Sequence, residues 1–455
     1  MTIQVSTVPD MGQTAVTTAV TTTDRAAYLT NLLALRSPLT SDMQWLQAIR
    51  DRAAIPLQGL AIPSTRNEEW RFTDLSGLLE VPLQAPLLPT RAIAASDLAA
   101  FTLPEAATSQ LVFVDGVYAP ALSNTSGLPT EVFVGALTDD NLPAAIRSQV
   151  ERSLAQLAGM EEPFTTLNTA SLHTGAVVYV PKNQVLDVPI HLLFVATATT
   201  PALIQPRIWA IAEQNSSVTL IEDYVALSSG GYFTNSVMEG WVADNAQLHH
   251  TRIQRESTAA YHIGKTAITQ GNDSRYTCTA FSLGAALSRH NLDIDKQGMQ
   301  TETVLNGLTM ITGQQVADTH SAIVYAQPHS TSQQLHKCIV DDHAHAVFNG
   351  KVFVPKAAQM TDASQLSQNL LLSPKGRVDT KPQLEITADN VKCTHGATVS
   401  QLDSDGVFYL QSRGIDEVAA RKLLVYAFAY EVIGQLPVVS LRDRLANLVR
   451  FQAQS

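Results

Sequence analysis

Cysteine is scarce in this chain. There are 3 in 455 residues, at positions 278, 338 and 393, which are far apart. Secreted domains that depend on disulfides are rich in cysteine, so an odd and scattered set excludes a disulfide framework. Free thiols persist in reducing compartments, and we therefore expect a cytoplasmic protein.

Charge is also low, and positive charge is the rarer sign. Charged residues make up 16% of the chain, hydrophobic residues make up 45%, and the formal net charge is −11. Proteins that bind nucleic acid or anionic membranes need a basic surface, because they neutralise phosphate groups. The composition predicts a globular protein of two or three domains that binds neither nucleic acid nor a membrane.

Long hydrophobic runs are missing as well. No stretch approaches 18 apolar residues, so we expect no membrane-spanning helix. Residues 1–23 are rich in threonine and have neither a basic start nor an apolar centre. This composition does not fit a signal peptide, and it predicts a disordered tail.

Several short catalytic motifs are absent from the sequence. It contains no G-x-x-x-x-G-K-[ST], no H-E-x-x-H, no C-x-x-C and no G-x-S-x-G. The first motif cradles nucleotide phosphates, so we expect the chain itself to bind no nucleotide. The other three carry zinc, redox and acyl-transfer chemistry, and their absence weakens the interpretation as an ordinary enzyme.

Short β-branched or alternating runs dominate from residue 111 to about 400. Examples are AVVYV from 176, SVTLIEDYV from 217, RYTCTAFSL from 275 and AVFNGKVFV from 346. Gly, Asn and Asp punctuate these runs every 10 to 15 residues or so, which is typical of an all-β unit. The region is long for one sandwich. A solenoid accommodates such length, but periodicity alone does not distinguish a solenoid from two sandwiches.

Helical patterns flank this β region. Asp24 can cap a helix that carries Leu29 and Leu32 on one side, and residues 414–434 form an apolar helical band ending at a glycine. Ser440 and Asp443 predict a capping box at the start of a last helix. We expect a disordered tail over 1–23, a helical region over 24–105, a β core over 106–405 and a helical region over 406–455.

The tripeptide Cys393-Thr394-His395 is a candidate metal site. On a strand, Cys393 and His395 share one face with their Cβ atoms roughly 6.6 Å apart, from about 3.3 Å of rise per residue. That spacing suits a shared metal ion better than a direct thiol–imidazole hydrogen bond. A structural metal site normally has four ligands, however, so the tripeptide taken alone favours an ordinary strand with a buried cysteine, and the metal site stays open.

A second candidate lies in the sequence DDHAHAVFNG. His343 and His345 are two residues apart, and on a strand they would share a face. Together with Asp341 or Asp342 they could supply two histidines and a carboxylate to a non-haem iron. The sequence therefore keeps a metal-dependent enzyme using Asp341, His343 and His345 as an alternative function.

Fixed positions in the last third of the chain carry a family resemblance. They lie in AVFNGKVFVPKAAQMTDASQLSQNLLLSP, in TKPQLEITADNVKCTHGATVSQLD and in FYLQSRGI, with NEEWRFTDL near the N-terminus. This pattern resembles the SufD group of the SufB/SufD family, whose members belong to the SUF system of iron–sulfur cluster assembly. Two positions depart from the usual pattern, since Thr394 replaces serine and Ser400 replaces glycine, and neither is a proposed ligand.

The resemblance implies both a fold and a set of partners. It implies a mainly β protein with a right-handed parallel β-helix flanked by N-terminal and C-terminal helical regions. It implies a non-enzymatic scaffold that pairs with a SufB-like paralogue through the β-helix ends, and a homodimer is also possible. ATP hydrolysis would belong to a separate SufC-like ATPase, which agrees with the missing phosphate loop.

The resemblance also assigns site residues. It implies that His395 and Cys393 contribute to a nascent, transient iron–sulfur cluster whose other ligands come from the partner. The C-terminal helices would dock the ATPase, and Arg413, Gly414, Tyr426 and Phe428 are expected at that interface.

Overall fold

Strands of eight to ten residues, separated by short turns, repeat along the middle of the chain. The computed structural model describes residues 24–39, 41–85, 93–157 and 161–452. Each strand from β8 to β18 pairs in parallel with the strand two positions later, so successive strands alternate between two sheets. This topology is a parallel β-helix. It confirms the solenoid that the family resemblance implies and rules out two β-sandwiches.

The strands form two sheets, and within each sheet the strands follow one another along the axis of the β-helix. Sheet I runs β2-β1-β5-β8-β10-β12-β14-β16-β18-β20, and sheet II runs β19-β17-β15-β13-β11-β9-β7-β4-β3 with β6 beside β9. The strands are β1 Gln110–Val114, β2 Val117–Tyr118, β3 Phe133–Ala136, β4 Ala176–Val180, β5 Ile190–Ala196, β6 Leu203–Ile204, β7 Arg207–Ala212, β8 Ser217–Ala226, β9 Phe233–Val242, β10 Gln247–Arg255, β11 Tyr261–Gln270, β12 Arg275–Ser282, β13 Leu287–Lys296, β14 Glu302–Ile311, β15 Val316–Tyr325, β16 Thr331–Val340, β17 His345–Val354, β18 Asp362–Leu371, β19 Arg377–Ile386 and β20 Lys392–Gln401.

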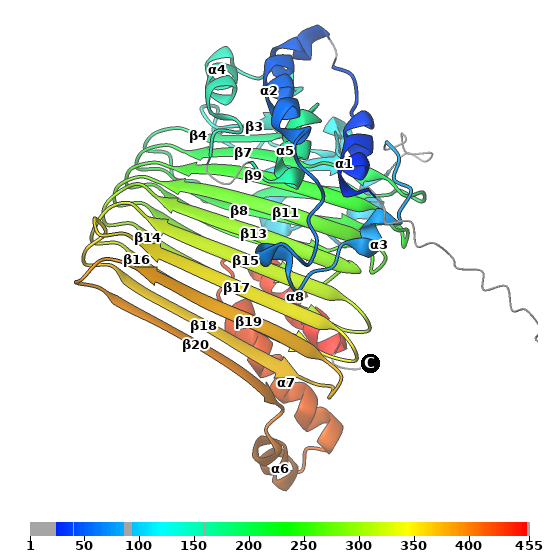
Figure 1. The fold of residues 1–455 in the computed structure, drawn as a ribbon, viewed down its shortest axis with the longest axis vertical. Helices are drawn as coiled ribbons and strands as arrows, with labels where there is room; N and C mark the ends of the chain where they lie inside the picture. The colour runs from blue at the N-terminus through cyan, green and yellow to red at the C-terminus, as the bar shows by residue number, and fades with distance from the viewer. Residues whose placement is uncertain (1–23, 40, 86–92, 158–160, 453–455) are drawn as a thin grey trace, which may run out of the picture.

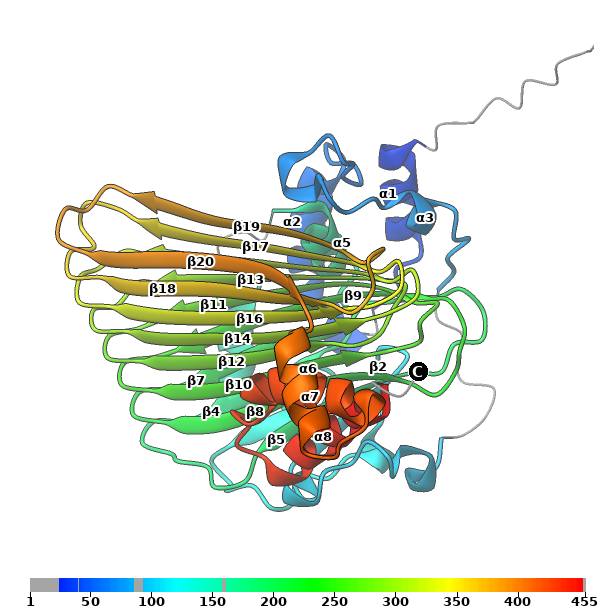
Figure 2. The ribbon, with the colours of Figure 1, turned by 90° about the horizontal axis from the view of Figure 1, so that it is seen from below.

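Helices lie at both ends of the described chain. They are α1 Arg25–Ala34, α2 Gln47–Leu57, α3 Ser76–Leu79, α4 Ala144–Ser153, α5 Pro163–Ala170, α6 Ser404–Ser412, α7 Glu417–Ile433 and α8 Val439–Gln452, with short 3-10 turns between some of them. The N-terminal helices, with α5, cover sheet II, and α7 and α8 cover sheet I (Figures 1 and 2). The tail expected over 1–23 lies outside the described residues.

Two predicted helix starts have different outcomes. The Asp24 carboxylate accepts hydrogen bonds from the backbone N–H groups of Ala26 at 3.0 Å and Ala27 at 3.2 Å, so the predicted cap is confirmed. The predicted capping box at Ser440 is wrong, because α8 begins one residue earlier. The Ser440 N–H and hydroxyl donate to Glu105 instead, which ties this helix to a distant part of the chain.

Asparagine and aspartate have a specific role at one corner of the solenoid. The turn after each sheet II strand from β7 to β17 contains one non-glycine residue with a φ between 56° and 64°, namely Asn215, Asn245, Asp273, Gln300, His329 and Met360. Asn and Asp tolerate this left-handed conformation better than most residues. The Asn245 amide also donates to Asn215 at 2.9 Å, and Asn215 donates to Asn183 at 2.8 Å, so side chains stack along this corner.

Candidate functional site

The tripeptide 393–395 lies on β20, the last strand of sheet I. The register pairs Cys393 with Ala363 and His395 with Gln365, and both of these β18 residues are buried inside the solenoid. Cys393 and His395 therefore share the inward-facing side of β20, as the two-residue spacing predicts. No further coil covers them in the described part of the chain, so His395 is exposed and Cys393 is only partly buried.

The two side chains have different surroundings. Cys393 packs against the apolar core of the solenoid, and partial burial, followed by the charge of Asp362, raises the pKa of its thiol. A raised pKa favours the protonated thiol, which is a poorer metal ligand than the thiolate. Among the residues that the structure describes, no three His, Cys, Asp or Glu side chains lie close enough to hold a metal ion. The pair can thus supply at most part of a ligand set.

The alternative site in DDHAHAVFNG is wrong as a metal centre. His343 lies in a turn and not on a strand, because Asp342 adopts a φ of 51° and β17 begins only at His345. The Asp342 carboxylate accepts hydrogen bonds from Thr312 at 2.7 Å and from the N–H of Gly313 at 3.0 Å. His345 contacts Asp379 of sheet II at 2.7 Å, so these side chains have separate structural partners.

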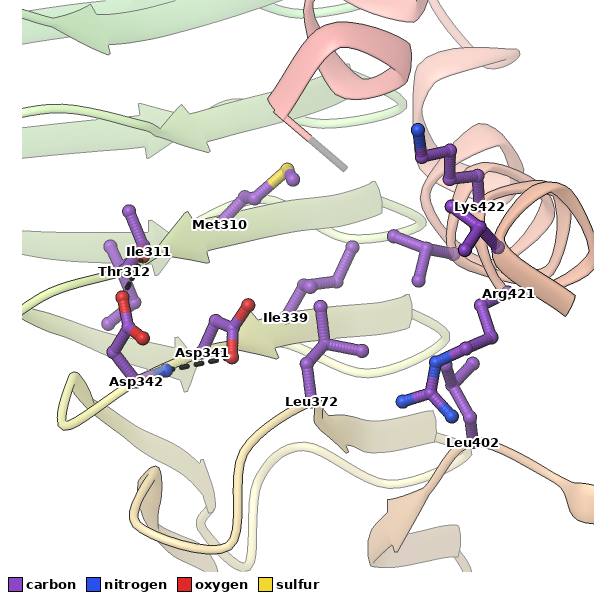
Figure 3. Close-up of a pocket in the computed structure, with 12 residues that line it drawn as sticks. Met310, Ile311, Thr312, Ile339, Asp341, Asp342, Leu372, Leu402, Arg421 and Lys422 are labelled. Carbon is purple, nitrogen blue, oxygen red and sulfur yellow. Dashed lines mark hydrogen bonds between the residues drawn. The ribbon is translucent and has the colours of Figure 1, made fainter. Parts of the chain in front are cut away.

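Asp341 lies at one end of a surface groove whose lining does not include His345. This groove has a volume of about 340 Å³ and lies between the ends of β14 and β16 and the first half of α7 (Figure 3). Its floor is apolar, with Ile339 and Leu372, and Arg421 and Lys422 lie at the end opposite Asp341. The carboxylate of Asp341 and the cations of Arg421 and Lys422 thus lie at opposite ends of the groove and do not form one cluster.

The four residues expected at an ATPase interface differ in location and in burial. Arg413 caps the C-terminal end of α6, and Gly414 follows it with a φ of 85°, a conformation that favours glycine. Both are exposed. Tyr426 and Phe428 are partly buried, with Arg450 over the Tyr426 ring at 4.5 Å and the Lys337 ammonium over the Phe428 ring at 4.2 Å.

Sequence reasoning missed two aromatic residues beside them. Phe408 and Tyr409 of α6 are 71% and 58% exposed, although aromatic side chains of this size are usually at least half buried. Val418, Leu423 and Tyr430 of α7 add further exposed apolar surface. We call this set, with Arg413 and Gly414, the α6–α7 patch. A helical pattern alone predicts which side of a helix is apolar, and α6 is too short for its pattern to show that this side stays uncovered.

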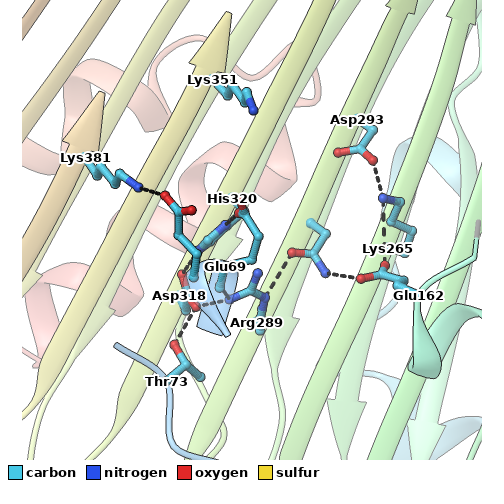
Figure 4. Close-up of polar contacts among 12 residues, drawn as sticks. Glu69, Thr73, Glu162, Lys265, Arg289, Asp293, Asp318, His320, Lys351 and Lys381 are labelled. Carbon is cyan, nitrogen blue, oxygen red and sulfur yellow. Dashed lines mark hydrogen bonds and ion pairs between the residues drawn. The ribbon is translucent and has the colours of Figure 1, made fainter. Parts of the chain in front are cut away.

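The sequence cluster at residues 68–71 forms a clamp on the outer face of sheet II. The Arg289 guanidinium lies 3.9 Å from the centre of the buried Trp70 ring and donates to the Glu69 carbonyl at 2.7 Å. It also pairs with the buried Asp318 at 2.6 Å (Figure 4). At the rim, the Glu68 carboxylate pairs with Lys381 of β19 at 2.7 Å. The cluster therefore attaches the N-terminal segment to sheet II.

The interior of the solenoid contains a buried polar cluster around Cys278. His250 Nε2 lies 2.9 Å from Glu222 Oε2, and its Nδ1 lies 3.0 Å from the Tyr276 hydroxyl and 3.9 Å from Cys278 Sγ. Burial opposes the charged imidazolium. Interactions with Cys278 and Glu222 outweigh burial and raise the pKa of His250 to about 9.

This pKa predicts that the protein loses stability in mild alkali. A raised native pKa stabilises the fold fully below the unfolded value of about 6.5, and the contribution is lost as pH rises through about 9. The free energy of unfolding should fall by about 3 kcal/mol over this range. Urea unfolding from pH 6 to 9.5 measures it, and His250→Gln should abolish the slope. His249→Gln, on the opposite face of β10, should keep the slope, and an unchanged slope in His250→Gln would contradict the assignment.

Comparisons with known proteins cover nearly the whole described chain. Residues 194–428 match the family described as SUF system FeS cluster assembly, SufBD core domain, and residues 29–192 match the SufBD protein N-terminal region. An iron–sulfur cluster assembly SufBD family protein of Synechocystis is 47% identical over 409 residues, which cover 88% of this chain and 89% of the relative. The iron–sulfur cluster assembly protein SufD of Escherichia coli is 32% identical, covering 84% and 88%. A chloroplastic protein of Arabidopsis thaliana named ABCI7 is 34% identical, covering 89% and 86%.

Proposed function

The chain belongs to the SufBD family of iron–sulfur cluster assembly proteins, and we propose that it is a non-enzymatic scaffold that contributes His395 and Cys393 to a nascent cluster. One observation carries the proposal. Both side chains lie on the inward-facing side of the final strand, and His395 is exposed there. Thiolate and imidazole both suit iron–sulfur chemistry, and the incomplete ligand set requires ligands from a second chain. Removal of the Cys393 proton would accompany metal binding.

The free end of the solenoid supports a paralogous partner. β19 and β20 are each hydrogen-bonded to one neighbouring strand only, within the described residues. Ten-residue edge strands are usually covered, because their unpaired N–H and C=O groups otherwise invite association. A second β-helix of the SufB type could pair with these edges, continue the sheets and bring its own ligands beside His395. A second copy of this chain could use the same edges, so a homodimer remains the alternative partner.

The α6–α7 patch supports the docking of a separate SufC-like ATPase. It is apolar at Phe408 and Tyr409 and includes the cation Arg413. α6 lies beyond β20, and α7 packs beside sheet I (Figures 1 and 2). Interfaces are often centred on aromatic and arginine side chains. The cluster would be transient and shared with the paralogue, and nucleotide would bind to the ATPase. No described helix is both long and apolar enough to cross a membrane, and we propose that the complex works in the cytoplasm.

Native pull-down of the tagged chain from its own cells, with mass spectrometry of the bound proteins, tests the partners. We expect a SufB-like paralogue and an ATPase with a phosphate loop. The double variant Phe408→Asp, Tyr409→Asp should reduce recovery of the ATPase more than about tenfold, since removing aromatic anchors typically costs more than about 1.4 kcal/mol. Recovery of the paralogue should fall less, because Phe408 and Tyr409 belong to α6 and not to the edge strands β19 and β20.

Ile55→Asp is the matched control for this experiment. Ile55 of α2 is 70% exposed, which is close to the exposure of Phe408, but it lies on the N-terminal side of the molecule. We expect this variant to retain both partners. If the double variant retains the ATPase at the level of the control, docking through the α6–α7 patch is wrong. Recovery of the chain without either partner would overturn the scaffold proposal as a whole.

A further inference from the structure

A ladder of amide side chains runs along the inside of the last coils, directly beneath His395. The Gln334 side-chain N–H donates to the Ser321 hydroxyl at 2.7 Å, and the Gln365 side-chain N–H donates to Gln334 Oε1 at 2.9 Å. Gln334 and Gln365 are register partners on β16 and β18, and His395 is the register partner of Gln365 on β20. The three side chains therefore occupy successive steps of one inward-facing row.

The ladder ends in an acceptor without a donor. Gln365 is 3% exposed, and its Oε1 is buried and makes no hydrogen bond. An amide oriented by its N–H toward the preceding coil presents its carbonyl oxygen toward the following one. A buried acceptor left unpaired costs folding free energy, so we expect a hydrogen-bond donor for this oxygen.

The position of the Gln365 amide is constrained from a third side. A Cβ atom added to Gly350 of the neighbouring sheet would lie 1.9 Å from Gln365 Nε2. The amide thus occupies space that only a glycine leaves open. This contact gives a physical reason for glycine in the sequence AVFNGKVFV, and it limits the freedom of Gln365 to rotate away from the row.

Few groups on β20 can donate to this oxygen. The inward-facing residues of the strand are Cys393, His395, Ala397, Val399 and Gln401, and Gln401 pairs with Leu371, six positions along β18 from Gln365. Alanine and valine side chains carry no donor, and a thiol is a weak one, whereas a neutral imidazole carries one good N–H donor. His395 is also the residue in register with Gln365.

We infer that Gln365 is a positioning residue for His395. Rotation of the exposed His395 side chain lets Gln365 Oε1, which is unpaired in the structure, accept a hydrogen bond from one ring N–H. This bond fixes the tautomer and leaves the lone pair of the other nitrogen free to bind iron. Histidine ligands in proteins usually donate their second ring N–H in this way, and the partner group sets which nitrogen meets the metal. The inference rests on the proposed cluster-assembly role of His395 and deepens it.

The tautomer of His395 can be read directly in the full-length chain. Two-bond ¹H–¹⁵N spectra of protein labelled with ¹⁵N-histidine distinguish the two neutral tautomers, and the signal missing in His395→Ala assigns the residue. We expect one dominant tautomer in the wild type and a mixture close to that of free imidazole in Gln365→Met. Equal tautomer populations in these two proteins would overturn the inference.

The variants are chosen so that a folding defect cannot mimic the result. Gln365→Met is similar in volume and should leave no cavity, although it loses the hydrogen bond to Gln334, and urea unfolding checks that the variant is folded. Gln365→Glu keeps an acceptor and should retain the dominant tautomer. Gln333→Leu removes an exposed glutamine from the outward side of β16 and should leave the spectrum of His395 unchanged.

Failure of this inference is distinguishable from failure of the proposed function. If Gln365→Met shifts the tautomer and lowers cluster formation about tenfold, the positioning role of Gln365 and the cluster role of His395 are both supported. Outer partners of metal ligands typically contribute factors of 10 to 100. If the tautomer shifts but His395→Ala assembles clusters normally, the hydrogen bond stands and the cluster role fails. If the tautomer does not shift, the positioning role fails whatever the activity.

Discussion

Replacing His395 with alanine should reduce iron–sulfur cluster formation at least about tenfold, because loss of a metal ligand should cost no less than loss of its outer partner. The protein should fold normally, since the His395 side chain is exposed and alanine keeps the backbone pairing of β20 with β18. The expected phenotype is poor growth under iron limitation, with the paralogue and the ATPase still recovered in pull-downs. Visible absorbance of clusters assembled on the purified complex gives the same comparison in vitro.

Thr394→Ala is the matched control for this prediction. Thr394 is the adjacent residue of β20, is also exposed, and lies on the outward-facing side of the strand. It tests whether any change at this edge disturbs pairing with the partner. Growth and absorbance of His395→Ala equal to those of Thr394→Ala would remove His395 from the site. Loss of the paralogue from the pull-down in both variants would point to the strand edge and not to the imidazole.

Replacing Arg289 with methionine should destabilise the protein by about 3 kcal/mol, the lower end of the usual cost of breaking a buried ion pair, because Asp318 keeps His320 at 3.0 Å. Arg289 is 3% exposed, and the carboxylate of Asp318 that it pairs with is fully buried. The variant also loses the contact with Trp70 and the hydrogen bond to the Glu69 carbonyl, so the clamp at residues 68–71 should loosen from sheet II. Urea unfolding at pH 7 measures the loss.

Acid should weaken the same clamp in the wild-type protein. Burial alone would raise the pKa of Asp318, but Arg289 and His320 hold it well below its usual range. A depressed native pKa contributes stability above the unfolded value of about 3.8, and this contribution is lost as pH falls below it. Arg289→Met should lose much of this acid sensitivity, because Asp318 then gains less from being ionised.

Lys381→Met is the control within the clamp. Lys381 pairs with Glu68 at 2.7 Å, but the two side chains are 39% and 74% exposed. Exposed pairs typically contribute about 0–1 kcal/mol, so this variant should unfold nearly as the wild type does. A loss in Arg289→Met no larger than that in Lys381→Met would show that the buried pair does not hold the N-terminal segment in place.

Local chemistry was enough to predict much of this protein. Alternating short strands with Asn and Asp turns are local patterns, and in the structure these residues adopt the left-handed corner conformation that favours them. The Asp24 cap was predictable for the same reason. Local patterns failed where a residue had a competing partner, as at Ser440, which bonds Glu105, and at Asp342, whose positive φ removes His343 from the strand.

Sequence patterns were sufficient to predict the mainly β fold class, the resemblance to the SufB/SufD family and the shared face of Cys393 and His395, because strand periodicity and motif order are properties of neighbouring residues. The folded structure was needed to show that His395 is the register partner of Gln365, whose Oε1 is unpaired, since the row joins residues about thirty positions apart whose register depends on the packing of whole coils. It also decided which apolar residues of α6 and α7 stay exposed. Burial depends on what the rest of the chain covers, and no local pattern contains that information.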